Sequence, residues 1–355
     1  MFKRLLLAAA AGFKTMIGGQ ALIEGIMMLG PDKKSVVVRK PDGTLEVKTE
    51  PRKLLKDRHP YASWPLVRGV VGFCSSMYNG VGALMYSAEF FPEDGETEEE
   101  PSRFEAWLER KLGSEKMYSL LLTVSMVLGM AFSVFLFFLL PTALGGAALH
   151  FIPGFPLWGR NLVEGVLRVV IFLGYLILCS HLKDIRRTFQ YHGAEHKTIF
   201  CYEKGLPLTV ENVRAQPRHH PRCGTSFLFV VIFVSILLSS ILFSFIQVEN
   251  TFARMGLHLL LLPAVVAITY EINRYVGGHD GGLCRLVRAP GMGIQRWTTF
   301  EPDDSMIEVG IRALREVLPQ VEGADRWRGR ERREKRGVRS WRLHTTTSIW
   351  RCGGS

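Results

Sequence analysis

The chain has 355 residues and a net charge of +11, and 47% of its residues are hydrophobic. The charge is concentrated in residues 323–355, which carry +7 of the total, so the basic composition does not indicate a nucleic-acid-binding protein. The six cysteines have no framework spacing, which argues against a disulfide-stabilised secreted domain.

The first 64 residues have a soluble character and are interpreted as an N-terminal segment. The stretch SVVVRKPDGTLEVKTE at 35–50 contains two alternating runs around Pro-Asp-Gly, a pattern that predicts a β-hairpin. The Gly-Gly pair of GGQALIEGIMM at 18–28 is interpreted as a turn. We therefore expect a small β-hairpin region before any membrane-spanning segment.

Residues 65–91 are apolar but rich in glycine and serine, and they predict an amphipathic or re-entrant helix, with a fifth membrane span as the alternative. Residues 92–117 contain the acidic run EDGETEEE and are interpreted as a solvated linker followed by a short helix.

Four apolar blocks predict transmembrane helices. They occupy residues 118–141, 166–182, 226–246 and 255–270, so that the first two helices lie within 118–182 and the last two within 226–273. A helix needs roughly 20 apolar residues to cross the hydrocarbon core of a bilayer. The expected fold class is therefore mainly α: a polytopic helical membrane protein with about four transmembrane helices.

The distribution of Lys and Arg predicts the orientation of these helices. The connection at 183–225 carries eight basic residues, whereas the connections at 142–161 and 247–253 carry Arg160 alone. Because an excess of Lys and Arg marks the cytoplasmic side, we expect the 183–225 connection and both termini to be cytoplasmic. The same side would then hold the C-terminal segment at 274–322 and the basic tail at 323–355.

The motif His-x-x-Glu-His, formed by His192, Glu195 and His196, is the most informative part of this connection. Two histidines four residues apart share a helix face and can bind one metal ion, while the glutamate can take a proton from a bound water molecule. His220 and Cys223 in RHHPRCG follow on the same connection and are candidates for the remaining ligands. We predict a zinc site at His192, His196, His220 and Cys223, with Glu195 as the catalytic base.

Three further residues are candidates for the site, because they are expected on the same side of the membrane: Glu211, Glu271 and His279. Near the other end of the helices, Glu164 and Arg168 form an i,i+4 pair that is interpreted as snorkelling toward the membrane surface, and Arg254 and His258 are interpreted similarly.

At this point the chain resembles a known family. The stretches GGQALIEGIMMLGPD, YHGAEHKTIFCYEKGLPLTVENVRAQPRHHPRCGTSF and TTFEPDDSMIEVGIRAL are similar to those of the YqhQ-like bacterial membrane proteins. Members of that family contain a domain of unknown function and are described as predicted metal-dependent enzymes. The resemblance to bacterial membrane proteins implies a location in the bacterial cytoplasmic membrane. The resemblance ends near Gly323, so the tail is interpreted either as a membrane-surface segment or as the product of a shifted reading frame.

Three functions remain open from the sequence. A zinc-dependent membrane hydrolase would act on a peptide, a lipid headgroup or a lipid-linked precursor. A non-enzymatic scaffold would use the zinc to fold the 183–225 connection for a cytoplasmic protein partner. A transporter is the third alternative, although the spans lack paired interruptions. A filled Cys/His shell would favour the scaffold, and an open shell beside Glu195 would favour the enzyme.

Overall fold

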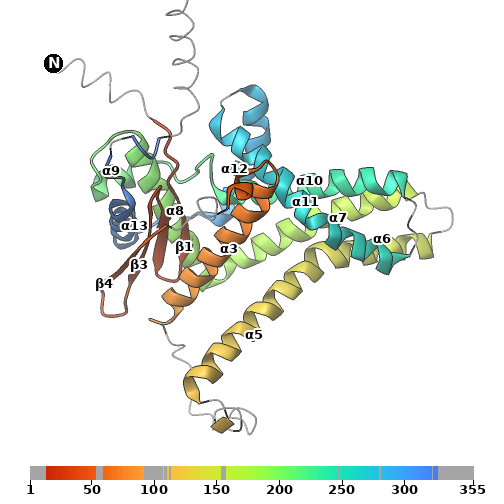
Figure 1. Ribbon diagram of the computed structural model, residues 1–355, viewed down its shortest axis with the longest axis horizontal. Helices are drawn as coiled ribbons and strands as arrows, with labels where there is room; N and C mark the ends of the chain where they lie inside the picture. The colour runs from red at the N-terminus through yellow and green to blue at the C-terminus, as the bar shows by residue number, and fades with distance from the viewer. Residues whose placement is uncertain are drawn as a thin grey trace, which may run out of the picture.

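The computed structural model describes residues 13–326 except 53–58, 92–106, 108–109, 112, 153–156, 247, 249, 280 and 322. The acidic run and most of the basic tail thus lie outside the described residues. A four-stranded sheet with helices beside it forms one end of the molecule, and a bundle of long helices extends from it (Figure 1).

The sheet is an antiparallel meander with the strand order β1-β2-β3-β4. Its strands are β1 (Gly18–Leu22), β2 (Gly25–Leu29), β3 (Lys33–Arg39) and β4 (Leu45–Pro51). The expected hairpin at 35–50 is confirmed as β3 and β4, with Gly43 at positive φ in its turn. The interpretation of the Gly-Gly pair as a turn is wrong, because both glycines lie in β1, and the turn falls instead at Glu24, which has a φ of 48°.

Helices cover both faces of the sheet. On one face Ile26, Met28 and Val37 pack against α8 (Lys183–Glu203) and α13 (Asp304–Val317). On the other face Met27 and Val36 pack against α3 (Val67–Ala88). Because both faces are buried, successive residues of β2 are all apolar and the strand shows no alternation in its sequence.

Among the described residues, four helices are long and apolar enough to cross a membrane, as the sequence predicts. These segments are Thr123–Ala147, Gly159–His181, Phe227–Phe245 and Thr251–Gly278. The first combines α5 (Ser114–Val134), the π-helical turn η2 (Phe135–Leu139) and α6 (Leu140–Phe151); the others belong to α7 (Leu157–His181), α10 (Gly224–Phe245) and α11 (Thr251–Gly278). The most apolar window of the first segment buries none of its residues against the rest of the chain, and α5 diverges from the other helices in Figure 1.

Helix α3 follows the 3-10 turn η1 (Pro60–Ser63) and is not one of these four helices. Its first half lies against α11, where a Cβ on Gly69 would come within 3.0 Å of Ala267, and its second half lies against the sheet, where Gly80 contacts Gln20. The glycines of the 65–91 stretch therefore serve close helix packing.

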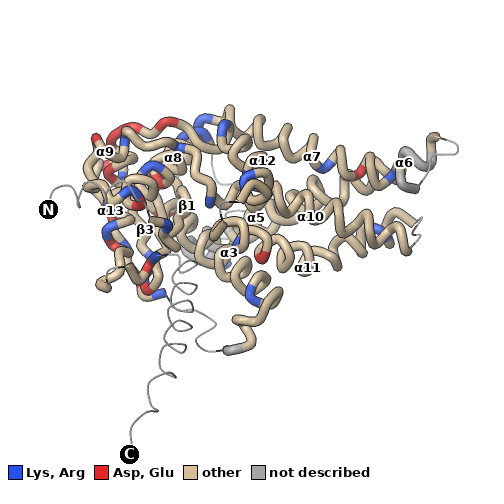
Figure 2. The backbone as a smooth tube through the Cα atoms, turned by 90° about the horizontal axis from the view of Figure 1, so that it is seen from above, with Lys and Arg blue, Asp and Glu red and all other residues tan. Residues whose placement is uncertain are grey.

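The connection between the second and third spans is largely helical rather than a loop. It contains α8 and the short helix α9 (Val210–Arg214), and α12 (Gly282–Thr298) follows the fourth span. Charged residues gather around the sheet and these helices, and they are sparse along α7, α10 and α11 (Figure 2). The polar end of the molecule thus lies at one end of the apolar bundle.

The start of the expected tail is packed against the N-terminal segment. The Thr15 hydroxyl donates to Asp325 Oδ2 at 2.7 Å, and the Met16 amide donates to the Asp325 carbonyl at 2.7 Å. Asp325 is 1% exposed, and Thr15 also forms a β-bridge with Arg326. The packed structure therefore continues to Arg326, beyond the expected boundary at Gly323.

Two truncations test this boundary. A chain that ends at Arg326 should unfold at the temperature of the full chain, whereas a chain that ends at Val321 should lose about 1–3 kcal/mol of stability, because Thr15 and Met16 lose buried hydrogen-bond acceptors. Thermal unfolding in detergent measures both, and Asp325→Asn in the full chain serves as a control for the carboxylate alone. Equal stability of the two truncated chains would show that these contacts do not contribute to folding.

Candidate metal centre

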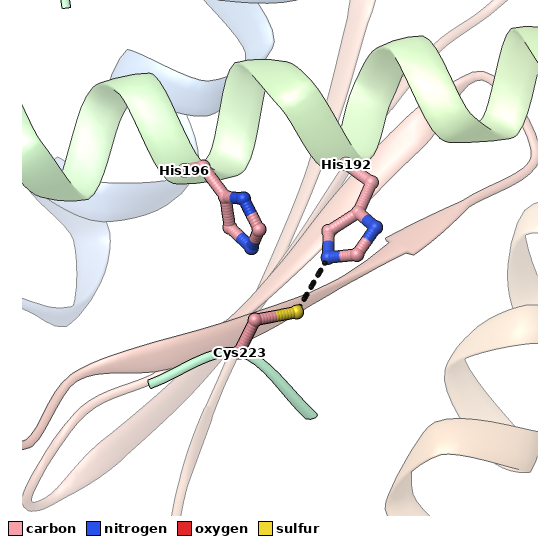
Figure 3. A group of neighbouring side chains, drawn as sticks. All are labelled: His192, His196 and Cys223. Atoms are coloured by element: carbon pink, nitrogen blue, oxygen red, sulfur yellow. Dashed lines mark hydrogen bonds between the residues drawn. The ribbon is translucent and has the colours of Figure 1, made fainter. Parts of the chain in front are cut away.

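His192, His196 and Cys223 converge on one point between α8 and the start of α10 (Figure 3). One ligand atom from each lies within 4.8 Å of the other two, and His192 Nε2 is 3.1 Å from Cys223 Sγ. Ligand atoms around one tetrahedral zinc ion are separated by about 3.3–3.6 Å, given bonds of roughly 2.0–2.3 Å. The three side chains therefore surround a position that one such ion could occupy after small movements.

The hydrogen bonds of the two histidines determine which ring nitrogens face this position. His192 Nδ1 is 2.8 Å from the carbonyl oxygen of Thr298, and His196 Nδ1 is 2.5 Å from that of Arg218. Because a carbonyl only accepts, each Nδ1 carries a proton, and in a neutral ring the lone pair then lies on Nε2. His196 Nε2 is buried and has no hydrogen-bond partner among the described residues. Histidine ligands of metals are held in this way by a carbonyl on the opposite nitrogen.

Cys223 is the N-cap residue of α10, and its sulfur accepts from the Thr225 amide at 3.4 Å and from the Thr225 hydroxyl at 3.3 Å. Burial raises the pKa of this thiol, but the neighbouring His196 and the Thr225 donors outweigh burial, so that the pKa lies below its ordinary value. Burial lowers the pKa of His196. A thiolate beside neutral imidazoles is the protonation state that metal binding requires.

Glu195 lies beside the three ligand candidates and is 5% exposed. Its Oε1 accepts from the Gly19 amide of β1 at 2.9 Å. Burial raises the pKa of Glu195 to about 7, against smaller lowering effects of His192 and of the Gly19 hydrogen bond. A Cβ on Gly19 would lie 2.7 Å from the Met27 carbonyl oxygen and 3.0 Å from Glu195 Cδ, so a glycine is needed for β1 to approach this carboxylate.

His220 does not belong to this group, although the sequence predicts it as a ligand. Its Nδ1 accepts from the Arg222 amide at 3.3 Å, and its Nε2 lies 3.6 Å from Glu203 Oε2. Gln295 holds its backbone from both sides, accepting from the His220 amide at 2.7 Å and donating to the His220 carbonyl at 2.8 Å. The ring lies 5.5 Å from that of His196, centroid to centroid, so His220 is a neighbour of the site.

The other three candidate residues lie elsewhere. Glu271 accepts from Arg68 of α3, with Nε at 2.6 Å. Glu211 is exposed on α9. His279 is exposed at the end of α11, where its Nδ1 lies 2.8 Å from the Tyr275 carbonyl oxygen. The structure brings none of them into the group with His192.

Sequence reasoning missed the residues that position the ligands. Gly19 and Thr298 act through backbone atoms, which leave no signal in the side-chain pattern of a single sequence. Lys197 is also buried, and its ammonium donates to the Arg214 carbonyl at 2.9 Å and to Glu301. The sequence held one signal for this contact, which was the lysine among the residues of a buried helix face.

Comparisons with known proteins support the resemblance seen in the motifs. A family described as "Protein of unknown function (DUF1385)" matches residues 64–320, a range that includes all three ligand candidates and Glu195. The chain is also similar to "Uncharacterized protein YqhQ" of Bacillus subtilis (strain 168), at 34% identity over 309 residues, which cover 85% of this chain and 92% of the relative. No solved structure matches the chain. Neither description names a metal or an activity.

The raised pKa of Glu195 predicts a pH-dependent stability of the metal-free chain. Between pH 4.5 and about 7 the folded chain holds this proton more tightly than the unfolded chain, so stability should fall as pH rises through that window, by up to roughly 3 kcal/mol. Glu195→Gln cannot lose a proton, so after chelation its unfolding temperature should rise relative to the unmodified chain between pH 5 and pH 8.

Glu211→Gln is the matched control, because Glu211 is an exposed glutamate of the same connection. Its unfolding temperature should follow that of the unmodified chain between pH 5 and pH 8, because hydrogen bonds from its own amide and from Thr209 lower the pKa of Glu211, so that it titrates below this window. A constant difference between Glu195→Gln and the unmodified chain across the pH range would contradict a raised pKa.

Proposed function

Because the chain belongs to the DUF1385 family, whose description names no activity, we propose from the geometry of its own residues that it is a membrane-bound, zinc-dependent hydrolase. One observation carries this proposal. Two histidines with Nδ1 tied to carbonyls present Nε2 lone pairs toward a cysteine of lowered pKa, and a buried glutamate lies beside them. Three protein ligands and one open position are typical of catalytic zinc sites.

The donor set fits zinc better than other common ions. Imidazole nitrogen and thiolate sulfur suit zinc, whereas magnesium and calcium prefer oxygen ligands. His196 Nε2, buried without a partner among the described residues, is accounted for if it binds an ion. The exclusion of His220 from the group leaves the fourth position for water or substrate.

Glu195 is the proposed general base. The bound ion would supply the Lewis acidity that makes a water molecule nucleophilic near neutral pH. Glu195 Oε1 is held by Gly19, so Oε2 is the oxygen that we expect to take the proton and return it to the leaving group. A pKa of about 7 suits both steps, because a group with this pKa can accept and donate a proton near neutral pH.

The place of the site relative to the bundle favours a substrate at the membrane surface. Cys223 precedes the third candidate span, which begins at Phe227, by about 6 Å along a helix. Helix α12, which supplies the Thr298 carbonyl, also exposes Leu283 and Leu286. A lipid headgroup, a lipid-linked precursor or a membrane-bound peptide would reach this position without leaving the bilayer.

We further propose that the site faces the cytoplasm of a bacterial cell, with both termini on the same side. The support is the excess of Lys and Arg on the connection that holds α8 and α9 over the connections at the opposite end of the bundle.

Cysteines placed at the two ends of the bundle test this orientation. Phe151 is 78% exposed at the end of α6, and Glu211 is exposed on α9. In intact cells, an impermeant thiol reagent should label Phe151→Cys, and it should label Glu211→Cys only after the membrane is opened, each compared with the parent chain. The reverse pattern would place the metal centre outside the cytoplasm.

A structural zinc site is the second candidate, and the position of the ligands on two different helices favours it. The histidines lie on α8 and the cysteine lies at the start of α10. One ion would therefore hold α8, which packs on the sheet, to α10, which is a candidate membrane span. In that case the chain would be a scaffold for a cytoplasmic partner, and Glu195 would contribute only to packing.

Metal content and a variant of Glu195 separate these outcomes. His192→Ala/His196→Ala should lose the single zinc ion per chain, whereas His279→Ala, which changes an exposed histidine outside the group, should keep it. Glu195→Gln should keep zinc and should not be less stable than the parent chain, yet it should fail to complement a strain that lacks the gene, because the base is lost while the shape remains.

Cys223→Ser completes the comparison, and it should lower the zinc content whether the ion is catalytic or structural. Full complementation by Glu195→Gln would end the catalytic proposal and leave the structural one. Unchanged zinc content in the double histidine variant would contradict both.

A further inference from the structure

Several ionisable residues buried within the helix bundle contact one another through Glu164. The sequence predicts that Glu164 and Arg168, and similarly Arg254 and His258, snorkel to the membrane surface, but the structure buries them between α7 and α11. Glu164 lies within 4.0 Å of each of the other three. Unpaired groups beside the candidate metal centre occur instead at the edge of the sheet.

Strand β1 is an edge strand, and its free edge faces the helix bundle. Among the described residues it pairs with β2 alone, and it is the strand nearest to the bundle (Figure 1). The two-residue turn that closes the β1–β2 hairpin sets the alternation of its hydrogen bonds, and by this alternation Gly19 and Ala21 direct their backbone groups away from β2. The Gly19 amide agrees with this direction, because it donates to Glu195 Oε1 at 2.9 Å.

Three backbone groups of this edge have no hydrogen-bond partner within the described part of the chain. They are the carbonyl of Gly19 and both the amide and the carbonyl of Ala21. The two residues are half-buried, whereas β2 beside them is largely buried. Backbone donors and acceptors that are accessible at the edge of a sheet form a template for another extended chain.

The opposite edge of the sheet is protected in a way that β1 is not. Strand β4 carries Glu46, Lys48 and Glu50 at alternate positions and ends with Pro51. Charged side chains and proline are common means of preventing an edge strand from pairing with other chains. The sequence of β1, GGQAL, contains neither a charge nor a proline. The free edge of β1 is therefore suited to pairing.

Gly19 connects this edge to the candidate metal centre. An antiparallel chain beside β1 would pair twice with Ala21 and would donate once to the Gly19 carbonyl. Its own carbonyl opposite Gly19 would find no donor in β1, because Glu195 already occupies the Gly19 amide. That carbonyl would lie beside Glu195, which is within one helical turn of both His192 and His196.

We propose that the free edge of β1 binds an extended polypeptide, antiparallel to β1, as the substrate of the hydrolase proposed above. The inference rests on that proposed function and names a peptide, rather than a lipid, as its substrate class. The residue opposite Gly19 would present its carbonyl to the position that the three ligand candidates surround. When an extended peptide adds a strand to a sheet in this way, main-chain hydrogen bonds supply much of the affinity.

The reaction at that carbonyl is a hydrolysis of the peptide bond. The oxygen of one water molecule forms a bond to the carbonyl carbon, and Glu195 takes a proton from that water. The C–N bond then breaks, and Glu195 gives the proton to the departing nitrogen. The products are a carboxyl group and an amine.

The surroundings of the edge favour apolar residues in this polypeptide. A Cβ on Gly18 would meet nothing within 4 Å, so there is room beside it for a large side chain of the bound polypeptide. Helix α3 contacts β1 at Gly80, and Met77 and Phe73, one and two turns earlier, are exposed. Phe73 also stacks on Phe227 of α10, with ring centroids 6.1 Å apart. Apolar side chains of α3 and α10 thus lie on the side of the edge that Gly18 faces.

The test uses the purified full chain in a non-ionic detergent, with zinc content measured in every sample. The probe is a library of peptides of about ten residues, rich in Val, Leu and Phe, each with a fluorophore and a quencher at its ends. The unmodified chain should cleave members of this library. Glu195→Gln should bind the same members without cleaving them, so their dissociation constants are measured with this variant by the fluorescence polarisation of peptides that lack the quencher.

Backbone N-methylation of a bound peptide removes one donor at a time and leaves the protein unchanged. Binding should weaken by about fivefold or more when the methyl group is on a residue opposite Gly19 or Ala21, because a hydrogen bond to β1 is lost. Methylation of the intervening residues should have a much smaller effect, since their amides point away from β1. Sensitivity should therefore alternate along the peptide.

Ala21→Pro, introduced into the Glu195→Gln chain, tests the same edge from the side of the protein. It removes the outward amide of β1, a position at which an edge strand tolerates proline, and should weaken peptide binding by about tenfold. Thr49→Pro in the same chain is the matched control, because the register of the β3–β4 hairpin directs the Thr49 amide outward from the other edge strand. It should leave peptide binding unchanged. Unfolding temperatures are measured for both variants.

Failure of this inference and failure of the proposed hydrolase give different results. No binding or cleavage of any library member by a chain that holds zinc would overturn the inference. Hydrolysis of dihexanoyl phosphatidylglycerol by that chain, lost in Glu195→Gln, would then leave the hydrolase with a lipid substrate. Peptides that bind with alternating sensitivity to N-methylation but are never cleaved would keep the β1 site and end the hydrolase proposal. Equal effects of methylation at every position, or unchanged binding by a folded Ala21→Pro chain, would overturn the β1 site.

Discussion

Helix α8 buries a row of polar side chains between Tyr191 and Cys201, and each of these groups needs a partner where water is excluded. The partners come from segments far apart in the chain: the Gly19 amide of β1, the carbonyls of Arg214 and Arg218, and the Thr298 carbonyl at the end of α12. These hydrogen bonds hold strand β1, the 214–218 segment and α12 around α8. The sheet and the membrane bundle are joined through this helix, and the candidate metal centre lies where the two meet.

Much of this arrangement could be predicted from the sequence where hydrophobicity is the deciding force. The four spans follow from long apolar runs, and the β3–β4 hairpin follows from alternation around Pro-Asp-Gly. Strands β1 and β2 were missed because both faces of the sheet are covered, which removes alternation, and because two glycines suggested a turn. The full extent of α8 was not predicted, because its buried face is polar and gives no apolar periodicity.

The candidate site was predictable in part. Helical spacing placed His192 and His196 on one face, and Cys223 lies on the same connection. Sequence could not show that His220, three residues before Cys223, turns toward Arg222 and Glu203, since adjacent loop residues point in different directions. Nor could it show that Glu271 is neutralised by Arg68, about 200 residues earlier in the chain. Partners of this kind depend on tertiary packing alone.

The residues of the candidate metal centre come from segments that are made at very different times during synthesis. The histidines follow the second span, Cys223 precedes the third, and Thr298, which fixes the tautomer of His192, follows the fourth. A nascent chain with two inserted spans would hold His192 without its carbonyl partner and without the thiolate. If the proposed ion binds here, it would therefore be held tightly only after the last span has entered the membrane, so that metal retention would report whether insertion is complete.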